Sequence, residues 1–533
     1  MRARLLSAVL LGSASGLGAQ TSLSPPVAPP ENPVTAAKAL LGKALFWDEQ
    51  LSSNGRMACG TCHRPEHGGG DPRRRRHPGL DGTLLTADDT WGSPGVERRD
   101  TAGRFVVDPR FGRDEQVTQR AAPGVTMAAW FETLFWDGRI DDTFVDPETG
   151  AVVIANGAAL EALALHPFTN PVEMARDGRS WAELRQRVAT VRPLALASDL
   201  PPDLQLAVGV ANDYPTMFAI AFGDGGVTLP RIAMALASYL RTTVPDQTPW
   251  DRHQQGVPGA MTSAQLAGLQ HFVDVKCADC HTPGLFSDRQ FRALGLTPVA
   301  QDPGRAGVTG DPADRGRFKV PSLRNAALKS TFLHNGRFTT MLQVVNFYRL
   351  GGGLESEADS LLQPFALDQV ETAELLDFLE NALVDPRARL GLPPFDRPTL
   401  WSEIAPVGST LYGTHTPVAG TSPVLHAQQP PFLGHSEWAL GFSSAPANGV
   451  GVLFLGLLPA APGAQLAGAT LHVDAWAFTL PFALDATGSQ TFGLPVPYLP
   501  ALSGLVLHGQ AFVADVPTAT QWGATRGATL PLR

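Results

Sequence analysis

Cysteine is scarce in this chain, with only four in 533 residues. All four lie in two short clusters, residues 59–63 and 277–281, and each cluster reads C-x-x-C-H. Exported proteins often use cysteines for disulfides, but none is left over here for a structural bridge. The cysteines therefore serve the two clusters alone.

Charge is sparse as well. Charged residues make up 17% of the chain and the formal net charge is -9, so the basic face that nucleic-acid binding requires is not expected. Long apolar runs are also missing: Leu5–Leu11 is far too short to span a bilayer, and no later segment is long and apolar enough. We expect neither a nucleic-acid partner nor a transmembrane span.

The N-terminus has the pattern of a secretory signal peptide. Two arginines precede the apolar run Leu5–Leu11, and small residues follow it up to Ala19. Residues 1–19 are predicted to be a signal peptide and residues 20–35 a proline-rich leader. The protein is thus expected in the periplasm, or secreted, or at the cell surface.

Apolar residues at helical spacing precede each cysteine cluster. The pattern begins near residue 36 before the first cluster, and a helix capped by Thr262 or Ser263 leads into the second. Polar residues 64–119 are interpreted as a long loop. Further helices are predicted at 181–188, 230–242 and 368–383. Because the chain is too long for one core, we predict two helical domains, residues 36–226 and 227–390.

Residues 395–533 differ from the rest of the chain. Charge thins out, short apolar runs alternate with glycine, proline and serine, and residues 470–475 show a period of two. This pattern predicts an all-β, sandwich-like domain of unknown role. The overall prediction is a mainly α protein with two c-type cytochrome domains plus this β domain.

A C-x-x-C-H peptide supplies what covalent haem attachment needs. Two thiols form thioethers with the haem vinyl groups, and the adjacent imidazole reaches the iron. Two covalently bound haem c groups are therefore predicted, with these attachment and iron-binding residues: Cys59, Cys62 and His63 for the first, Cys277, Cys280 and His281 for the second.

The C-x-x-C pattern has two other interpretations. A thioredoxin-like redox pair would need a βαβ context, which is absent here, and a zinc site would need the two clusters to meet. Neither explains a histidine directly after each second cysteine. Haem attachment is the better interpretation.

Several further motifs occur in a fixed order: LGKALFWDEQLSSNGRMACGTCH (41–63), LFWDGR (134–139), NPVEM (170–174), CADCHTPGLFSD (277–288), DPGR (302–305), VPSLRNAALKSTFLHNGRF (320–338) and NFYRLGGG (346–353). On these motifs, residues 41–383 resemble the bacterial dihaem cytochrome c peroxidases, a family that includes the MauG-type enzymes. The β domain lies outside the resemblance.

The resemblance implies roles for three further residues. Glu173 corresponds to the distal acid/base that moves a proton during peroxide cleavage, and Trp136 to an oxidisable indole between the two haems. Tyr348 falls where classical peroxidases carry a methionine ligand of the second haem and MauG-type members carry tyrosine. Without the family, these would be an ordinary surface or capping glutamate, a core tryptophan and a packed tyrosine.

The chain also departs from the family pattern. The family holds a calcium ion between its domains through an asparagine two residues before a proline, but residues 120–123 read Arg-Ala-Ala-Pro. Lys329 stands on the turn that would provide backbone carbonyls. Calcium requires oxygen ligands, so these residues argue against calcium, and the Lys329 ammonium is a candidate substitute. His67 and His77 do not fall clearly at the position of a distal histidine.

The resemblance implies a peroxidase that reduces hydrogen peroxide with electrons from a small donor protein, a cytochrome c or a cupredoxin. Two alternatives stay open. The tyrosine at position 348 favours a MauG-type oxidase that acts on a protein or organic substrate. A protein of a different class, a non-enzymatic electron-transfer cytochrome or haem sensor, is also compatible with the sequence.

Overall fold

The computed structural model describes residues 23–103, 106–112, 114–354, 357–404, 410–427, 431, 438–497, 499–502, 504–515 and 521–532. The predicted signal peptide, residues 1–19, lies outside the described residues. No helix in these ranges is long and apolar enough to cross a membrane.

The fold is mixed α/β, so the prediction of a mainly α protein is wrong. Helices hold 29% of the residues and strands 20%. Glycine- and proline-rich connections keep the helices short, whereas the C-terminal part contributes long strands such as β12 (Val450–Pro459) and β15 (Val473–Ala483). The balance therefore shifts from helix toward strand.

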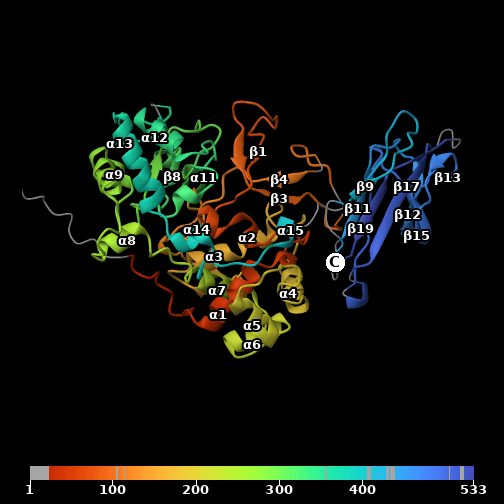
Figure 1. Ribbon diagram of the computed structural model, residues 1–533, viewed down its shortest axis with the longest axis horizontal. Coiled ribbons are helices and arrows are strands. Elements are labelled where there is room, and N and C mark those ends of the chain that lie inside the picture. The colour runs from red at the N-terminus through yellow and green to blue at the C-terminus, as the bar shows by residue number, and fades with distance from the viewer. Residues whose placement is uncertain are drawn as a thin grey trace, which may run out of the picture.

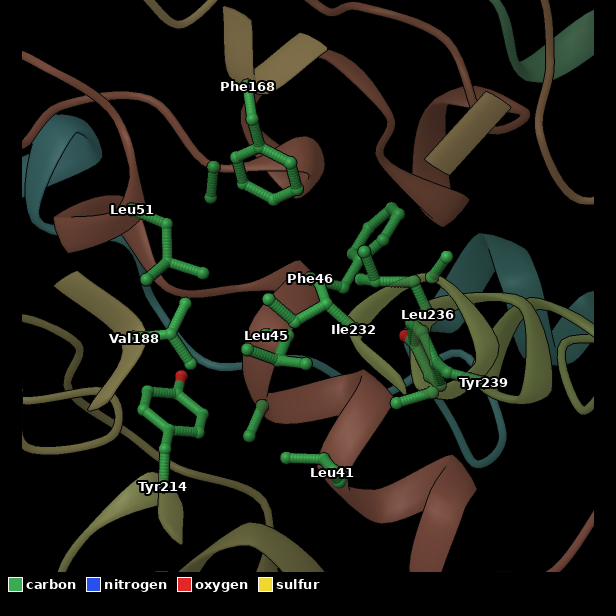
Figure 2. Packing of buried hydrophobic residues seen from close by; sticks show 14 of the residues in the cluster. Leu41, Leu45, Phe46, Leu51, Phe168, Val188, Tyr214, Ile232, Leu236 and Tyr239 are labelled. Atoms are coloured by element: carbon green, nitrogen blue, oxygen red, sulfur yellow. The ribbon is translucent and has the colours of Figure 1, made fainter. Parts of the chain in front are cut away.

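The first helical core is built around α1 (Ala36–Phe46) and α7 (Leu229–Leu240). A side chain on Gly42 would place its Cβ 1.9 Å from the carbonyl oxygen of Ala235, so the two helices approach closely because residue 42 is glycine. Figure 2 shows apolar side chains of these two helices meeting others from neighbouring helices: Leu41, Leu45, Val188, Tyr214, Ile232 and Leu236. Other helices of this region are α3 (Ala159–Ala164), α4 (Trp181–Thr190), α5 (Pro202–Val210) and α6 (Tyr214–Phe222).

The second helical core lies between α9 (Ser263–Asp274), α12 (Met341–Arg349) and α13 (Gln369–Asp377), the last continued by a π-helical turn to Ala382. Thr262 caps α9 as predicted, accepting a hydrogen bond from the backbone N–H of Gln265. Shorter helices are α8 (Pro249–Gln254), α11 (Ala306–Thr309), α14 (Pro386–Leu390) and α15 (Trp401–Ile404). The predicted helices near 181–188, 230–242 and 368–383 are thus confirmed.

The two helical regions also contain short pairs of antiparallel strands. In the segment predicted as a long loop, β1 (Arg75–His77) pairs with β2 (Thr90–Gly92), forming a hairpin that projects between the helical regions in Figure 1. The remaining pairs are β3 (Pro94–Glu97) with β4 (Glu115–Val117), β5 (Phe144–Val145) with β6 (Val152–Ile154), and β7 (Phe291–Ala293) with β8 (Arg317–Lys319).

The C-terminal part forms a curled half-barrel sheet faced by a smaller sheet. The larger sheet has the order β15-β12-β17-β19-β9, with β18 paired to β17, and the smaller one has the order β10-β11-β16. Apolar side chains fill the space between them, among them Phe442, Leu453, Val513 and Leu530. Their bounds are β9 (Thr410–Tyr412), β10 (Val424–His426), β11 (Ala439–Ser443), β16 (Gln490–Gly493), β17 (Val506–Ala514), β18 (Trp522–Ala524) and β19 (Gly527–Pro531); β13 (Gln465–Leu466) and β14 (Ala469–Thr470) form a small separate pair.

The β part joins the molecule beside the first cysteine cluster. In Figure 1 it lies on the far side of the first helical region from α9 and α13. The connecting segment is held by ion pairs: Arg397 lies 2.7 Å from both Glu66 and Glu403, and Arg64 lies 2.6 Å from Glu403. Because Arg64 directly follows His63, this segment is anchored next to the first cluster.

Candidate haem-binding site

Both C-x-x-C-H clusters line one cavity of about 780 Å³. The first cluster approaches it from the helical region around α1, and the second from the end of α9. The two clusters are more than 200 positions apart in sequence, so only the fold brings them to the same cavity.

The first cluster forms a one-turn helix, α2 (Cys59–Cys62), followed by His63. The Nδ1 atom of His63 lies 2.9 Å from the carbonyl oxygen of Gly69. A carbonyl can only accept, so Nδ1 carries the proton and donates it. The Nε2 atom is then unprotonated, and its lone pair can bind a metal ion.

The second cluster repeats this arrangement. Helix α10 (Cys277–Cys280) precedes His281, whose Nδ1 lies 3.0 Å from the carbonyl oxygen of Phe286. The same reasoning leaves Nε2 unprotonated. Both imidazoles are thus fixed in the tautomer that a haem iron requires.

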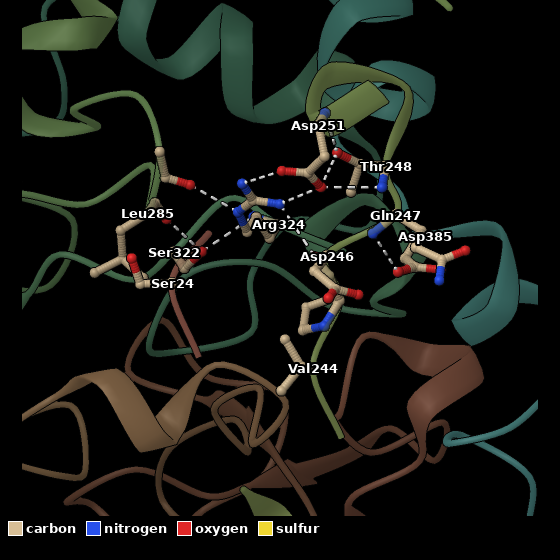
Figure 3. A network of polar contacts seen from close by, with 12 residues as sticks. Ser24, Val244, Asp246, Gln247, Thr248, Asp251, Leu285, Ser322, Arg324 and Asp385 are labelled. Carbon is tan, nitrogen blue, oxygen red and sulfur yellow. Dashed lines mark hydrogen bonds and ion pairs between the residues drawn. The ribbon is translucent and has the colours of Figure 1, made fainter. Parts of the chain in front are cut away.

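A buried ion pair supports the loop that orients His281 (Figure 3). Arg324 contacts the Asp251 carboxylate at 2.7 and 2.8 Å and donates at 2.7 Å to the carbonyl of Gly284. Ser322 donates at 2.7 Å to the carbonyl of Leu285. These bonds hold the two residues directly before Phe286.

The cysteines do not have the properties of a redox pair or a zinc site. Burial raises the pKa of Cys59 and of Cys277 to about 12, whereas catalytic thiols have lowered pKa values. Within the described ranges, no three His, Cys, Asp or Glu side chains are grouped to hold a metal ion. Neither alternative to haem attachment has support from the geometry.

Glu173 lines the cavity on the side of the first cluster. It lies in a turn where its backbone N–H donates to the carbonyl of Asn170 at 3.1 Å. Burial raises the pKa of its carboxyl to about 7, and the positive charge of Arg139 acts in the opposite direction. A carboxyl with this pKa can both accept and return a proton near neutral pH.

Trp136 lies where the two helical regions meet, on the cavity wall. Its indole N–H donates to the carbonyl of Ala121 at 2.8 Å, and its own carbonyl accepts from the backbone N–H of Lys319 at 2.8 Å. Its ring meets the His334 ring edge-on at 6.3 Å. His334 in turn stacks on Phe318 with the ring centroids 3.6 Å apart.

An arginine joins the same two regions. Arg120 contacts Asp137 of the first region at 2.5 Å and Asp302 of the second at 2.6 Å. Arg120 directly precedes Ala121, which binds Trp136. Trp136 is therefore bound by a segment that two ion pairs fix between the two helical regions.

Tyr348 lines the other end of the cavity, on α12. Burial, and then the nearby Cys277 and Cys280, raise the pKa of its hydroxyl above the ordinary value. Met341, seven residues earlier on the same helix, also lines the cavity. The structure thus brings Glu173, Trp136 and Tyr348 to the cavity that both clusters share.

Sequence reasoning assigned no role to some cavity residues. Lys319, His334 and Met341 line it, as does His77 of strand β1, whereas His67 does not. Of these, His77 has a buried Nδ1 without a hydrogen-bond partner among the described residues. No spacing signal marks such residues, because each reaches the cavity through tertiary packing.

A cavity with two imidazoles oriented in this way is typical of a protein that holds two haems. Residues 36–258 match the family described as di-haem cytochrome c peroxidase. Methylamine utilization protein MauG of Paracoccus denitrificans is 30% identical over 346 residues, which cover 59% of this chain and 75% of that protein. Cytochrome-c peroxidase IdrP1 of Pseudomonas sp. is 27% identical over 443 residues, covering 76% and 96%.

The fold has a counterpart among solved structures. The crystal structure of a MauG-like protein associated with microbial copper homeostasis matches with a TM-score of 0.50 and 24% identity, over 70% of this chain and 96% of that one. The chain belongs to the di-haem cytochrome c peroxidase family. It is therefore an oxidoreductase of a haem-containing family.

The residues present fit two haems. Each end of the cavity offers a pair of thiols and an imidazole whose Nδ1 is bound to a backbone carbonyl, and the lining between them includes apolar residues such as Phe131 and Val320. Calcium does not fit equally well. The Nζ atom of Lys329 donates to the carbonyl of Ala122 at 2.7 Å, so this carbonyl already has a donor.

Proposed function

We propose that the protein reduces hydrogen peroxide to two waters, using two electrons from a small redox protein, a cytochrome c or a cupredoxin, and two protons. The observation that carries this proposal is the shared cavity, which both the Glu173 carboxyl and the His63 imidazole line. Relatives named cytochrome-c peroxidase support it.

In this proposal the thiols of Cys59 and Cys62, and those of Cys277 and Cys280, form thioethers with the two haems, and His63 and His281 bind the irons. When bound, the haem irons would supply the electrons that reduce peroxide and would pass on the donor's electrons that replace them. The protein's own residues hold these groups in place and control the protons.

Glu173 moves the proton. Its ionised carboxylate takes a proton from one peroxide oxygen and returns it to the other, which leaves as water. A pKa of about 7 suits both halves of this transfer, because neither the acid nor the base form is strongly favoured. Trp136, held by Ala121 and by the Lys319 backbone, is proposed to pass electrons between the two haem sites.

Tyr348 is proposed as a residue that would bind the second haem iron together with His281. An anionic phenolate favours higher oxidation states, whereas a methionine thioether favours the reduced state. This residue is the observation that supports a second candidate function, a MauG-type oxidase acting on a protein or organic substrate. Relatives named MauG point the same way.

We further propose that the protein acts in the periplasm, or secreted, or at the cell surface, since the pattern of residues 1–19 is that of an export signal. At the junction of the two haem regions, Lys329 takes the place of calcium. Its ammonium binds the Ala122 carbonyl that a metal ion would otherwise attract.

One pair of measurements separates the candidates. Peroxide added to the purified protein should change its optical spectrum, and reduced cytochrome c or a cupredoxin should then be consumed. A spectral response without donor consumption would favour the oxidase. An unchanged spectrum would contradict both enzyme functions and leave the electron-transfer cytochrome.

A further inference from the structure

Lys319 ends strand β8, beside the second helical region, but its side chain contacts the first. The Nζ atom donates at 2.8 Å to the carbonyl of Thr133 and lies 4.4 Å from the centre of the Phe131 ring. Its backbone N–H donates to the carbonyl of Trp136. The ammonium is therefore fixed at the junction of the two haem sites, on the cavity wall.

This ammonium has no carboxylate partner among the described residues. Asp137 is the acidic group that acts on it, but its carboxylate is already bound by Arg120 at 2.5 Å and Arg139 at 2.9 Å. Desolvation by burial, only partly opposed by Asp137, lowers the pKa of Lys319 to about 7. Burying a charge without a partner is costly.

Several other buried cations of the described chain have such partners. Lys43 pairs with Asp203, Arg241 with Glu161 and Arg324 with Asp251, each at 2.7 or 2.8 Å. Three arginines that line the cavity and are less deeply buried, Arg120, Arg139 and Arg292, also pair with aspartates. Lys319 has no such partner among the described residues, and it shares this property with Lys329, whose Nζ atom donates to the carbonyl of Ala122.

An ammonium carries three N–H donors, and the Thr133 carbonyl accepts one of them. Because the Lys319 side chain lines the cavity, its two remaining N–H donors can serve a ligand bound there. A ligand in this cavity that carries a buried carboxylate would supply the missing anion. Haem has two such groups, its propionate side chains, which need cations or donors when they are removed from water.

We propose that Lys319 binds a propionate carboxylate of one haem, and so positions that haem beside Trp136. The proposal rests on the proposed binding of two haems. It assigns Lys319 a positioning role: the charged hydrogen bond fixes the haem edge nearest the tryptophan, and the positive charge offsets a negative charge that otherwise favours the oxidised iron.

The test compares Lys319→Met with Lys319→Arg in the holoprotein. Haem content is measured first, because fewer than two haems per chain in the unmodified protein would contradict the proposed function itself. With two haems present, Lys319→Met should lower the midpoint potential of one haem, and Lys319→Arg should restore it. The propionate bands in the resonance Raman spectrum should shift in the methionine variant alone.

A purely structural lysine would behave differently. Both variants would then change the thermal stability while the two potentials and the propionate bands stayed the same, and this result would overturn the proposal. If Lys319→Met does not accumulate as a folded holoprotein, Lys319→Gln provides the same comparison, since it removes the charge and keeps a donor. A Raman shift with Lys329→Met, but not with a Lys319 variant, would also overturn it.

Discussion

The Nδ1 atom of His63 lies 2.9 Å from the carbonyl oxygen of Gly69. At the other end of the cavity the same bond is made by His281 to the carbonyl of Phe286, at 3.0 Å. Two unrelated loops therefore fix two imidazoles in the same tautomer. This equivalence suits two metal ligands, and the other residues of the cavity then make the two sites different: Glu173 lines the first and Tyr348 the second.

Covalent attachment can be tested one cluster at a time. Replacing both Cys277 and Cys280 by serine should halve the haem that remains on the chain in a denaturing gel, because the thioethers of the second site cannot form. The reciprocal variant at Cys59 and Cys62 is the matched control and should leave the other haem attached. Unchanged haem staining in either variant would exclude attachment through that cluster.

Glu173→Gln should slow the peroxide step by on the order of 10² or more, the usual contribution of a positioned acid/base. Both haems should remain bound. The measurement is the rate of the spectral change after rapid mixing with peroxide. Glu132→Gln, which changes an exposed carboxyl, is the control and should leave the rate unaltered.

The pH dependence has a defined sign. The folded-state pKa of Glu173 is raised to about 7, so the carboxyl is protonated below this pH and ionised above it. Because the ionised form accepts the proton from peroxide, the rate should rise through about pH 7 and level off above it. The glutamine variant should lose this inflection. An inflection that persists in Glu173→Gln would assign it to another group.

The parts of the site that sequence predicted are those encoded by neighbouring residues. The two C-x-x-C-H clusters and the Thr262 cap of α9 depend on local spacing. Each cluster forms a one-turn helix, and Thr262 caps α9 as predicted. Lys319 escaped prediction because its partners, Thr133 and Phe131, are almost 190 positions away. The sequence around Lys319 does not predict this contact.

The fold class was misjudged for a related reason. Apolar periodicity identifies helices well, but it does not give the lengths of the C-terminal strands, which hold most of the strand residues, or reveal which loop residues pair as short strands. The hairpin of β1 and β2 depends on pairing across Arg75 and Gly92, and its base is fixed by a hydrogen bond from Trp91 to the carbonyl of Asn335 in the other helical region. This hydrogen bond joins the hairpin to the other helical region.

Tyr348→Met should raise the midpoint potential of one haem, because a thioether favours the reduced iron more than a phenolate does. Redox titration, with electron paramagnetic resonance to identify the axial ligands, measures this change. Tyr348→Phe is a control that removes the phenolate without adding sulfur. If instead Met341→Leu alters the potential and both Tyr348 variants do not, Met341 on the same helix is the ligand.

Chelation tests the substitution of calcium by Lys329. The purified protein should contain no stoichiometric calcium by elemental analysis, and a chelator should leave its optical spectrum and melting temperature unchanged. Lys329→Met should lower the free energy of unfolding by roughly 1–3 kcal/mol, because the Ala122 carbonyl loses a charged hydrogen-bond donor in a buried position. Lys276→Met, at an exposed lysine that lines the same cavity, is the control and should have little effect on stability. One tightly bound calcium per chain, with a loss of stability on its removal, would show that the ammonium does not replace the metal.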